Sequence, residues 1–234
     1  MKPIYKPQPG KLMRVVVFFS GGASALKYLL DNDPNLNVKY QFVGAFTDRK
    51  EAVGIELARH AGIPVEILDY REFIKERRAK FSDMIARREY FAQVIEKIAK
   101  WQPDILMQSG FMLIVTEPLL SQYKHRILNV HPADLTILDE HGRRRYVGLD
   151  AVTKAIQAGE KSTRSTIHLV TEEADAGPIV LLSDPLPVEP GVDPKAHQEK
   201  MKWACDGPAY QKTLELIVGG RIWLELTTGR IQIR

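Results

Sequence analysis

The sequence is poor in several features that would place it in a special class of protein. Its 234 residues include one cysteine, Cys205, which cannot form an internal disulfide and has no CxxC partner for a redox pair or a zinc site. No run approaches the 18 apolar residues of a membrane span, and the opening MKPIYKPQPG has proline and lysine where a signal peptide has an apolar core. These absences predict a cytoplasmic protein that needs neither a disulfide nor a structural metal and does not enter a membrane.

Charge of one sign is also scarce. The 33 basic and 29 acidic residues leave a formal net charge of +4, which suits an anionic partner but is too small to indicate nucleic acid. The densest basic runs are KERRAK near Arg77 and the three arginines Arg143 to Arg145. Charge runs alone indicate function weakly, so a solvated face is the first expectation for both.

Strand and helix patterns alternate along most of the chain. The continuous apolar run Leu12 to Phe19 is typical of a strand buried on both faces, as in a parallel sheet. Further strands are predicted over Tyr40 to Phe46, Pro64 to Leu68, Asp104 to Gln108, Arg126 to Val130, Ser165 to Thr171 and Pro178 to Leu186. The alternation predicts an α/β fold, with an open, mostly parallel, Rossmann-like sheet and helices on both faces.

The ends of the chain differ from this pattern. Residues 1–11 are expected to form a flexible arm, and residues 12–234 a single domain. A helix is predicted from about Pro194 to Val218, and a short one over Thr116 to Tyr123 with Thr116 as its N-cap and Pro118 in its first turn. The final GRIWLELTTGRIQIR alternates around a turn at 227–229, which predicts a C-terminal β-hairpin.

Ligands of open α/β sheets bind at the carboxyl ends of the strands, so the loops there are the candidate functional segments. The first, Ser20-Gly21-Gly22-Ala23-Ser24, joins a strand to a helix. Small residues there let backbone N–H groups approach a phosphate at the helix N-terminus. The loop lacks the full GxGxxG spacing and the lysine of a Walker loop, so a tight turn that binds nothing is the alternative.

The second segment, Asn129-Val130-His131-Pro132, ends a predicted strand. Period-2 alternation points Asn129 and His131 to the same side, and Pro132 favours an extended backbone at His131. An amide donor beside an imidazole can polarise a carbonyl and accept a proton. The alternative is a structural histidine that only makes hydrogen bonds.

The third segment, Glu172 to Pro178, lies between two predicted strands and contains Asp175. Its carboxylate could orient His131 and stabilise the imidazolium, provided that the fold brings the two loops together. Acidic residues are also common in glycine-containing turns, so Asp175 as a turn former is the alternative.

In combination, these segments resemble a known family. SGGAS at Ser20, SGFMLIV at Ser109, RILNVHP at Arg126 and STIHLVTEEADAGPIVL at Ser165 occur in one order. This order is similar to that of the folate-dependent formyltransferases, most closely the phosphoribosylglycinamide (GAR) formyltransferases. The similarity covers roughly residues 12–222, and its specific part is Asn-x-His-Pro followed by Asp-x-Gly-Pro.

The resemblance implies that an amine attacks the formyl carbon of 10-formyltetrahydrofolate, with no metal. It assigns the tetrahedral intermediate to Asn129 and His131, with Asp175 supporting the histidine and raising its pKa. It assigns the acceptor's phosphate to Ser20, Gly21, Gly22, Ala23 and Ser24, assisted by Arg87 of an Arg-x-x-Tyr pattern. It assigns the folate to Met112, Leu113, Ile114, Val115, Val170, Thr171, Glu172 and Glu173.

The chain departs from the family pattern where the acceptor would be recognised. The phosphate loop ends in Ala25 where an asparagine is usual, and the loop Ala133 to Val147 is longer and more basic. The resemblance therefore implies purine biosynthesis with GAR as the acceptor and small molecules as partners. Another amine acceptor such as an amino-sugar nucleotide, hydrolysis of 10-formyltetrahydrofolate, and a non-catalytic folate- or nucleotide-binding protein stay open. A monomer and a homodimer are both compatible with the sequence.

Overall fold

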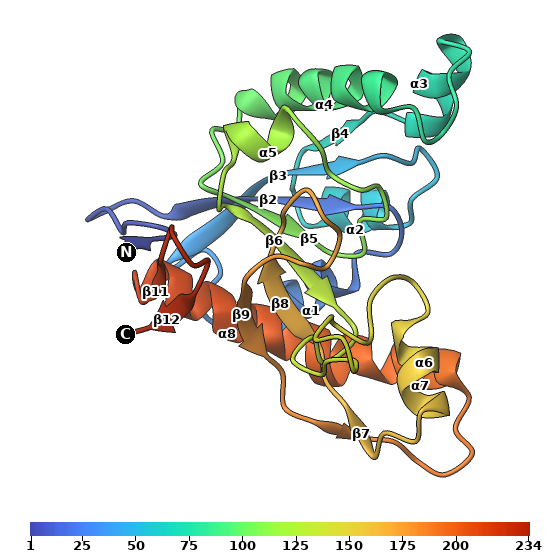
Figure 1. Ribbon diagram of the computed structural model, residues 1–234. Coiled ribbons are helices and arrows are strands. Elements are labelled where there is room, and N and C mark those ends of the chain that lie inside the picture. The colour runs from blue at the N-terminus through green and yellow to red at the C-terminus, as the bar shows by residue number, and fades with distance from the viewer.

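The computed structural model describes residues 1–234 and is organised around a seven-stranded sheet (Figure 1). The first five strands in spatial order are parallel, and the last two run antiparallel to their neighbours. The order is β4 (Val65–Ile67), β3 (Tyr40–Thr47), β2 (Met13–Phe19), β5 (Ile105–Gln108), β6 (Ile127–His131), β8 (Thr166–Leu169) and β9 (Ile179–Leu182). The predicted open, mostly parallel α/β sheet is confirmed.

The central strand β2 is buried on both faces, as its sequence predicts. Val15 and Val17 contribute to the larger hydrophobic core on one face, whereas Val16 and Phe18 contribute to the core on the other. Successive side chains of a strand point to opposite faces of the sheet, so a strand that is covered on both faces has mainly apolar side chains.

Helices cover both faces, again as predicted (Figure 1). The layer over one face contains α1 (Ser24–Asn32), α2 (Gly54–His60) and α8 (Gly207–Val218). The layer over the other contains α3 (Tyr70–Glu76), α4 (Met84–Ala99) and α5 (Leu119–Gln122). No helix combines the length and the apolar character that a membrane crossing requires.

The predicted helix from Pro194 to Val218 consists of three parts. These are α7 (Pro194–Met201), the π-helical segment η1 (Lys202–Asp206) and α8. At the start of α8, a Cβ on Gly207 would collide with the ring of Tyr28 in α1. The glycine therefore permits a close approach of α8 to α1. Together with α6 (Ala151–Gln157), α7 lies beyond the carboxyl end of the sheet, beside the small ladder of β7 (Ser162–Thr163) and β10 (Leu186–Pro187).

The short helix α5 differs from its prediction. It begins at Leu119, with Pro118 rather than Thr116 at the N-cap and no side-chain cap. The carbonyl of Thr116 instead accepts the N–H of Leu119, which closes a turn before the helix.

The C-terminal β-hairpin is confirmed as β11 (Ile222–Leu224) and β12 (Ile231–Ile233). The arm 1–11 is partly different from the flexible segment that the sequence predicts. Its first residues form β1 (Lys2–Pro3), which pairs antiparallel with β11, and Ile4 is buried in the main core. An apolar residue at position 4 thus ties the arm to the hairpin.

Candidate active site

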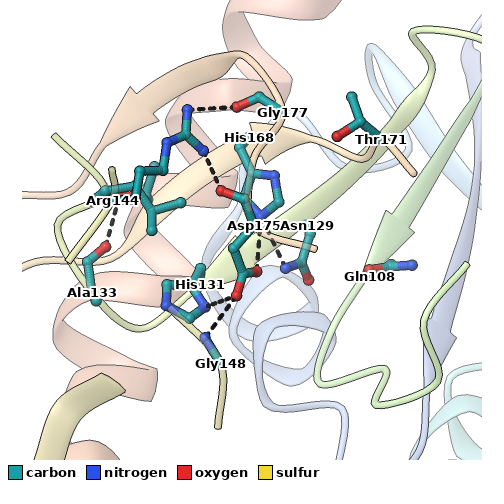
Figure 2. Close-up of polar contacts among 12 residues, drawn as sticks. Gln108, Asn129, His131, Ala133, Arg144, Gly148, His168, Thr171, Asp175 and Gly177 are labelled. Carbon is teal, nitrogen blue, oxygen red and sulfur yellow. Dashed lines mark hydrogen bonds and ion pairs between the residues drawn. The ribbon is translucent and has the colours of Figure 1, made fainter. Parts of the chain in front are cut away.

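A row of side chains crosses four neighbouring strands at the carboxyl end of the parallel sheet. Phe18 of β2 is the register partner of Gln108 in β5, Gln108 that of Asn129 in β6, and Asn129 that of His168 in β8. Residues in one register row point to the same face of a sheet. The fold therefore places Gln108, Asn129 and His168 side by side (Figure 2).

His168 anchors the amide of Asn129. The Nε2 atom of His168 lies 3.1 Å from Nδ2 of Asn129, and its Nδ1 lies 3.0 Å from the carbonyl oxygen of Leu169. A carbonyl can only accept, so Nδ1 carries the hydrogen and the neutral ring accepts the Asn129 N–H at Nε2. One N–H of the Asn129 amide is thus fixed, and the other is left for a ligand.

His131 and Asp175 face each other, as the sequence predicted they would if the loops met. Nδ1 of His131 lies 3.4 Å from Oδ2 of Asp175, and both side chains are largely buried (Figure 2). On the other side of the ring, Nε2 lies 2.8 Å from the carbonyl oxygen of Tyr146. Since that carbonyl accepts, Nε2 holds the hydrogen in the neutral ring and Nδ1 is free to take a second proton.

Asp175 is held as a carboxylate. Burial raises its pKa, but the nearby rings of His168 and His131 and the N–H of Gly148 together lower the pKa to about 2. The Gly148 N–H donates to Oδ2 over 3.0 Å, and Oδ1 lies 3.6 Å from Nε2 of His168. The backbone of Asp175 has a φ of 56°, a left-handed conformation that aspartate tolerates better than most residues. A turn conformation and a carboxylate that contacts His131 therefore coexist at Asp175.

The pKa of His131 differs from the expectation that Asp175 would raise it. Burial lowers the pKa of His131 below its usual value, and the nearby Asp175 and the Tyr146 carbonyl only partly offset this effect. His131 is therefore mainly neutral at pH 7, and Asp175 acts by making its protonation less costly.

The basic loop Ala133 to Val147 contacts the Asp175 segment directly. Arg144 donates from Nη1 to the carbonyl of Asp175 and from Nη2 to that of Gly177, the latter over 2.8 Å. Its neighbours point elsewhere, because Arg143 pairs with Asp139 and Arg145 lies over the ring of Tyr146. The run is thus neither a uniform solvated face nor three free guanidinium groups.

The glycine loop offers several unpaired donors. The backbone N–H groups of Gly21, Gly22, Ala23 and Ser24 make no hydrogen bond within the protein. A Cβ on Gly21 or Gly22 would meet nothing within 4 Å, and neither residue has a positive φ. Turn geometry alone does not require glycine at these two positions, which weakens the alternative of a simple tight turn.

Ser20 is engaged inside the protein. Its N–H donates to Gly110, while its hydroxyl donates to Asp48 over 2.5 Å and accepts from the N–H of Met112 over 2.8 Å. Ser20 therefore fixes the loop against the segment after β5, and its own donors are not free.

Arg87 lies apart from the glycine loop. It is in α4, on the opposite face of the sheet from α1, and only 7% exposed. Its Nη2 donates to the carbonyl of Phe81 over 3.0 Å, and its Nε has no partner. The structure shows no contact between Arg87 and the loop from Ser20 to Ser24.

The predicted folate segment alternates between core and surface. Leu113 and Val115 are packed in the core, whereas Met112 and Ile114 are 51% and 49% exposed. Thr171, Glu172 and Glu173 are exposed, and Val170 is partly buried. Leu113 and Val115 are thus core residues, whereas Met112 and Ile114 are accessible to a ligand.

Two side chains and one backbone carbonyl of the site were not identified from the sequence. His168 could have been found only by assuming that its strand pairs antiparallel with the Asn129 strand. Arg144 donates to the backbone carbonyls of Asp175 and Gly177, and Tyr146 accepts from His131 with its own backbone carbonyl. No sequence signal predicts contacts to backbone carbonyls. The structure contains no group of three or more histidine, cysteine or acidic side chains that could hold a metal ion.

The His131 and Asp175 contact generates a prediction. In the Asp175→Asn variant the pKa of His131 should fall further below that of the wild type, because the charge that raises it is lost. An NMR titration of the His131 ring would measure this. Glu140→Gln, which removes an exposed carboxylate at the tip of the basic loop, is the matched control. An unchanged His131 pKa in Asp175→Asn would contradict the coupling.

Comparisons with known proteins agree with the motifs. Residues 13–204 match the Formyl transferase family. Phosphoribosylglycinamide formyltransferase of Escherichia coli K12 is 30% identical over 169 residues, which is 72% of this chain and 71% of that protein. The trifunctional purine biosynthetic protein adenosine-3 of Homo sapiens is 28% identical over 92% of this chain, which spans only 19% of that longer protein.

A solved structure shows the same fold. Glycinamide ribonucleotide transformylase 1 from Symbiobacterium toebii superposes with a TM-score of 0.78 and 26% identity over 96% of this chain and 95% of that one. The resemblance predicted from the motifs is confirmed, and the chain belongs to the family of folate-dependent formyltransferases.

Proposed function

We propose that this enzyme transfers the formyl group of 10-formyltetrahydrofolate to the amine of phosphoribosylglycinamide, with Asn129, His131 and Asp175 at the reacting atoms. The observation that carries the proposal is the convergence of these three side chains at the carboxyl end of β6, to which the loop after β8 brings Asp175. The E. coli relative, named for this reaction, supports the choice of acceptor.

The geometry supports a mechanism through a tetrahedral intermediate. The amine nitrogen attacks the formyl carbon, and the formyl oxygen becomes an oxyanion. The free N–H of Asn129 donates to that oxyanion, because its other N–H is held by His168. A fixed donor needs no reorganisation during the reaction, which is why it favours the transition state over the substrate.

His131 is suited to move the proton. Attack leaves an extra proton on the amine nitrogen, and the unprotonated Nδ1 of His131 can accept it. Asp175, 3.4 Å away, then stabilises the imidazolium. When the bond from the formyl carbon to the folate nitrogen breaks, that proton passes to the leaving nitrogen, and the products are the formylated amine and tetrahydrofolate.

The glycine loop is suited to the acceptor's phosphate. Four consecutive unpaired N–H groups at 21–24 precede and open α1, where the helix dipole favours an anion. Of the five residues predicted for this role, Gly21 and Gly22 are exposed and Ser24 is partly exposed, so their unpaired N–H groups are accessible. Ala23 is buried, and Ser20 only holds the loop in place.

A formyl-transfer assay with a panel of amine acceptors tests the proposal. Release of tetrahydrofolate should be fastest with phosphoribosylglycinamide, and slow with amino-sugar nucleotides and with water alone. Faster turnover with an amino-sugar nucleotide would show that Ala25 and the basic loop, which depart from the family pattern, recognise a different acceptor. Release without any amine would indicate a hydrolase, and no release would indicate a non-catalytic binding protein.

Variants of the two strand-end residues test the assignment of roles. Asn129→Ala and His131→Ala should each lower kcat by on the order of 100- to 1000-fold, because each removes an interaction made in the transition state. Folate binding and the melting temperature, measured by calorimetry, should change little. A loss of folding in both variants, with normal turnover of the folded fraction, would show that their role is structural.

Gly22→Val tests the phosphate loop. The side chain has room in the free protein, so the fold should persist, but the Cβ and its methyl groups occupy the approach to the N–H groups. We expect the KM for the acceptor to rise about tenfold or more, a change equivalent to about 1.4 kcal/mol, while the KM for folate stays near the wild-type value. Equal effects on both substrates would contradict a phosphate site here.

Arg144→Ala tests the contact between the basic loop and the catalytic loop. Loss of two hydrogen bonds to the backbone around Asp175 should misplace the carboxylate and lower kcat on the order of 10- to 100-fold. Arg143→Ala, which breaks only the exposed pair with Asp139, is the control. The salt dependence of the KM for the acceptor should be the same in Arg144→Ala as in the wild type. A salt-sensitive rise in that KM would instead make Arg144 a direct ligand of the acceptor.

A further inference from the structure

Gln108 ends a strand that is otherwise apolar. In β5 it follows Ile105, Leu106 and Met107, and the residue is only 5% exposed. Its backbone carbonyl accepts the hydroxyl of Tyr210 over 2.6 Å. No hydrogen bond joins its side-chain amide to the rest of the protein, and Figure 2 draws that amide without an interaction.

The amide of Gln108 nevertheless reaches the open side of the site. The fully buried side-chain nitrogen and oxygen atoms without a partner are Nε of Arg87 and Oγ1 of Thr213. Because the Gln108 amide has no partner and is not among them, its polar atoms contact solvent. The small exposed area of this residue therefore includes its amide, at the carboxyl edge where the ligands of such sheets bind.

The position of this amide is set by the sheet. Gln108 and Asn129 are register partners on neighbouring parallel strands, which lie about 4.8 Å apart. On its other side, Gln108 has Phe18 as its register partner. After Gln108 the chain turns through Ser109 and Gly110 into the segment with the exposed Met112 and Ile114. Gln108 thus lies beside the strand of the proposed oxyanion donor and precedes the turn into a partly exposed apolar segment.

A glutamine here is costly for the free protein. An amide that is nearly buried loses hydrogen bonds with water, and an apolar side chain of similar size would avoid this loss. The surrounding core is filled by aromatic and aliphatic side chains, including Phe18 and Phe111. A bound molecule that supplies the missing hydrogen-bond partner would explain why an amide occupies this position.

We infer that Gln108 hydrogen-bonds the heteroaromatic ring of the folate donor and is a specificity-determining residue of this site. The inference rests on the proposed function. With Asn129 at the formyl oxygen, the next polar atoms of the donor lie on its nitrogen-rich ring. A carboxamide offers both a donor and an acceptor, which matches a ring edge that carries both. A ring without the matching groups would leave the amide unpaired and bind more weakly.

Binding of tetrahydrofolate, which has the ring but no formyl group, tests the inference by calorimetry. Gln108→Leu removes the amide and Gln108→Met also keeps the unbranched shape. In both variants the Kd for tetrahydrofolate should rise about tenfold or more. The melting temperature without ligand should stay the same or rise, since no unpaired amide remains. Gln122→Leu, at an exposed glutamine of α5, is the control and should bind as the wild type does.

Several outcomes would overturn the inference. A Kd for tetrahydrofolate that is unchanged in both variants would show that the amide does not contact the ring. Weaker binding in Gln108→Leu with normal binding in Gln108→Met would make shape, not hydrogen bonding, responsible. These measurements do not need turnover, so the inference can fail while wild-type formyl transfer to phosphoribosylglycinamide proceeds. Absence of that transfer in a wild type whose variants bind tetrahydrofolate more weakly would instead reject the proposed function.

Discussion

The antiparallel pairing of β8 with β6 is the constraint on which the site depends. It sets His168 against Asn129, so that the amide is fixed by an imidazole from the neighbouring strand. The chain that leaves β8 then returns Asp175 over His131 before it enters β9. Because β8 runs antiparallel to β6, its carboxyl end lies at the edge of the sheet opposite His131. The loop between β8 and β9 therefore folds back along the sheet and brings Asp175 to the histidine.

The segment 144–148 supports this arrangement from the opposite side. It contacts the Asp175 backbone through Arg144, the His131 ring through the carbonyl of Tyr146 and the Asp175 carboxylate through the N–H of Gly148. The His131 ring and the Asp175 carboxylate, which also contact each other, are thus both held by this segment. His131 and Asp175 are therefore held from two directions, which fixes their separation better than either loop alone could.

Some parts of this structure can be predicted from the sequence, and others cannot. The strands with continuous apolar runs, such as β2, and the direction of Asn129 and His131 follow from local periodicity. The approach of Asp175 to His131 does not, because it depends on the pairing of strands far apart in the chain. Motif similarity supplied that contact in advance. It also grouped Arg87 with the glycine loop, whereas the structure places Arg87 in α4 of the other layer, where it is buried and donates to the carbonyl of Phe81. A motif conveys residue identity but not the local turns that decide where a long side chain goes.

The pairing of β1 with β11 has a consequence for the chain as a whole. Lys2 is aligned with Leu224, and both termini lie together at the end of the molecule opposite the carboxyl ends of the parallel strands (Figure 1). A short flexible peptide could join them into a closed ring without crossing the active site. Such a ring would have fewer unfolded conformations, so the folded state would gain stability by loop-closure entropy and not by any new contact. The same ring could then be opened at the exposed tip of the loop 139–142 to give a permuted chain of the same fold.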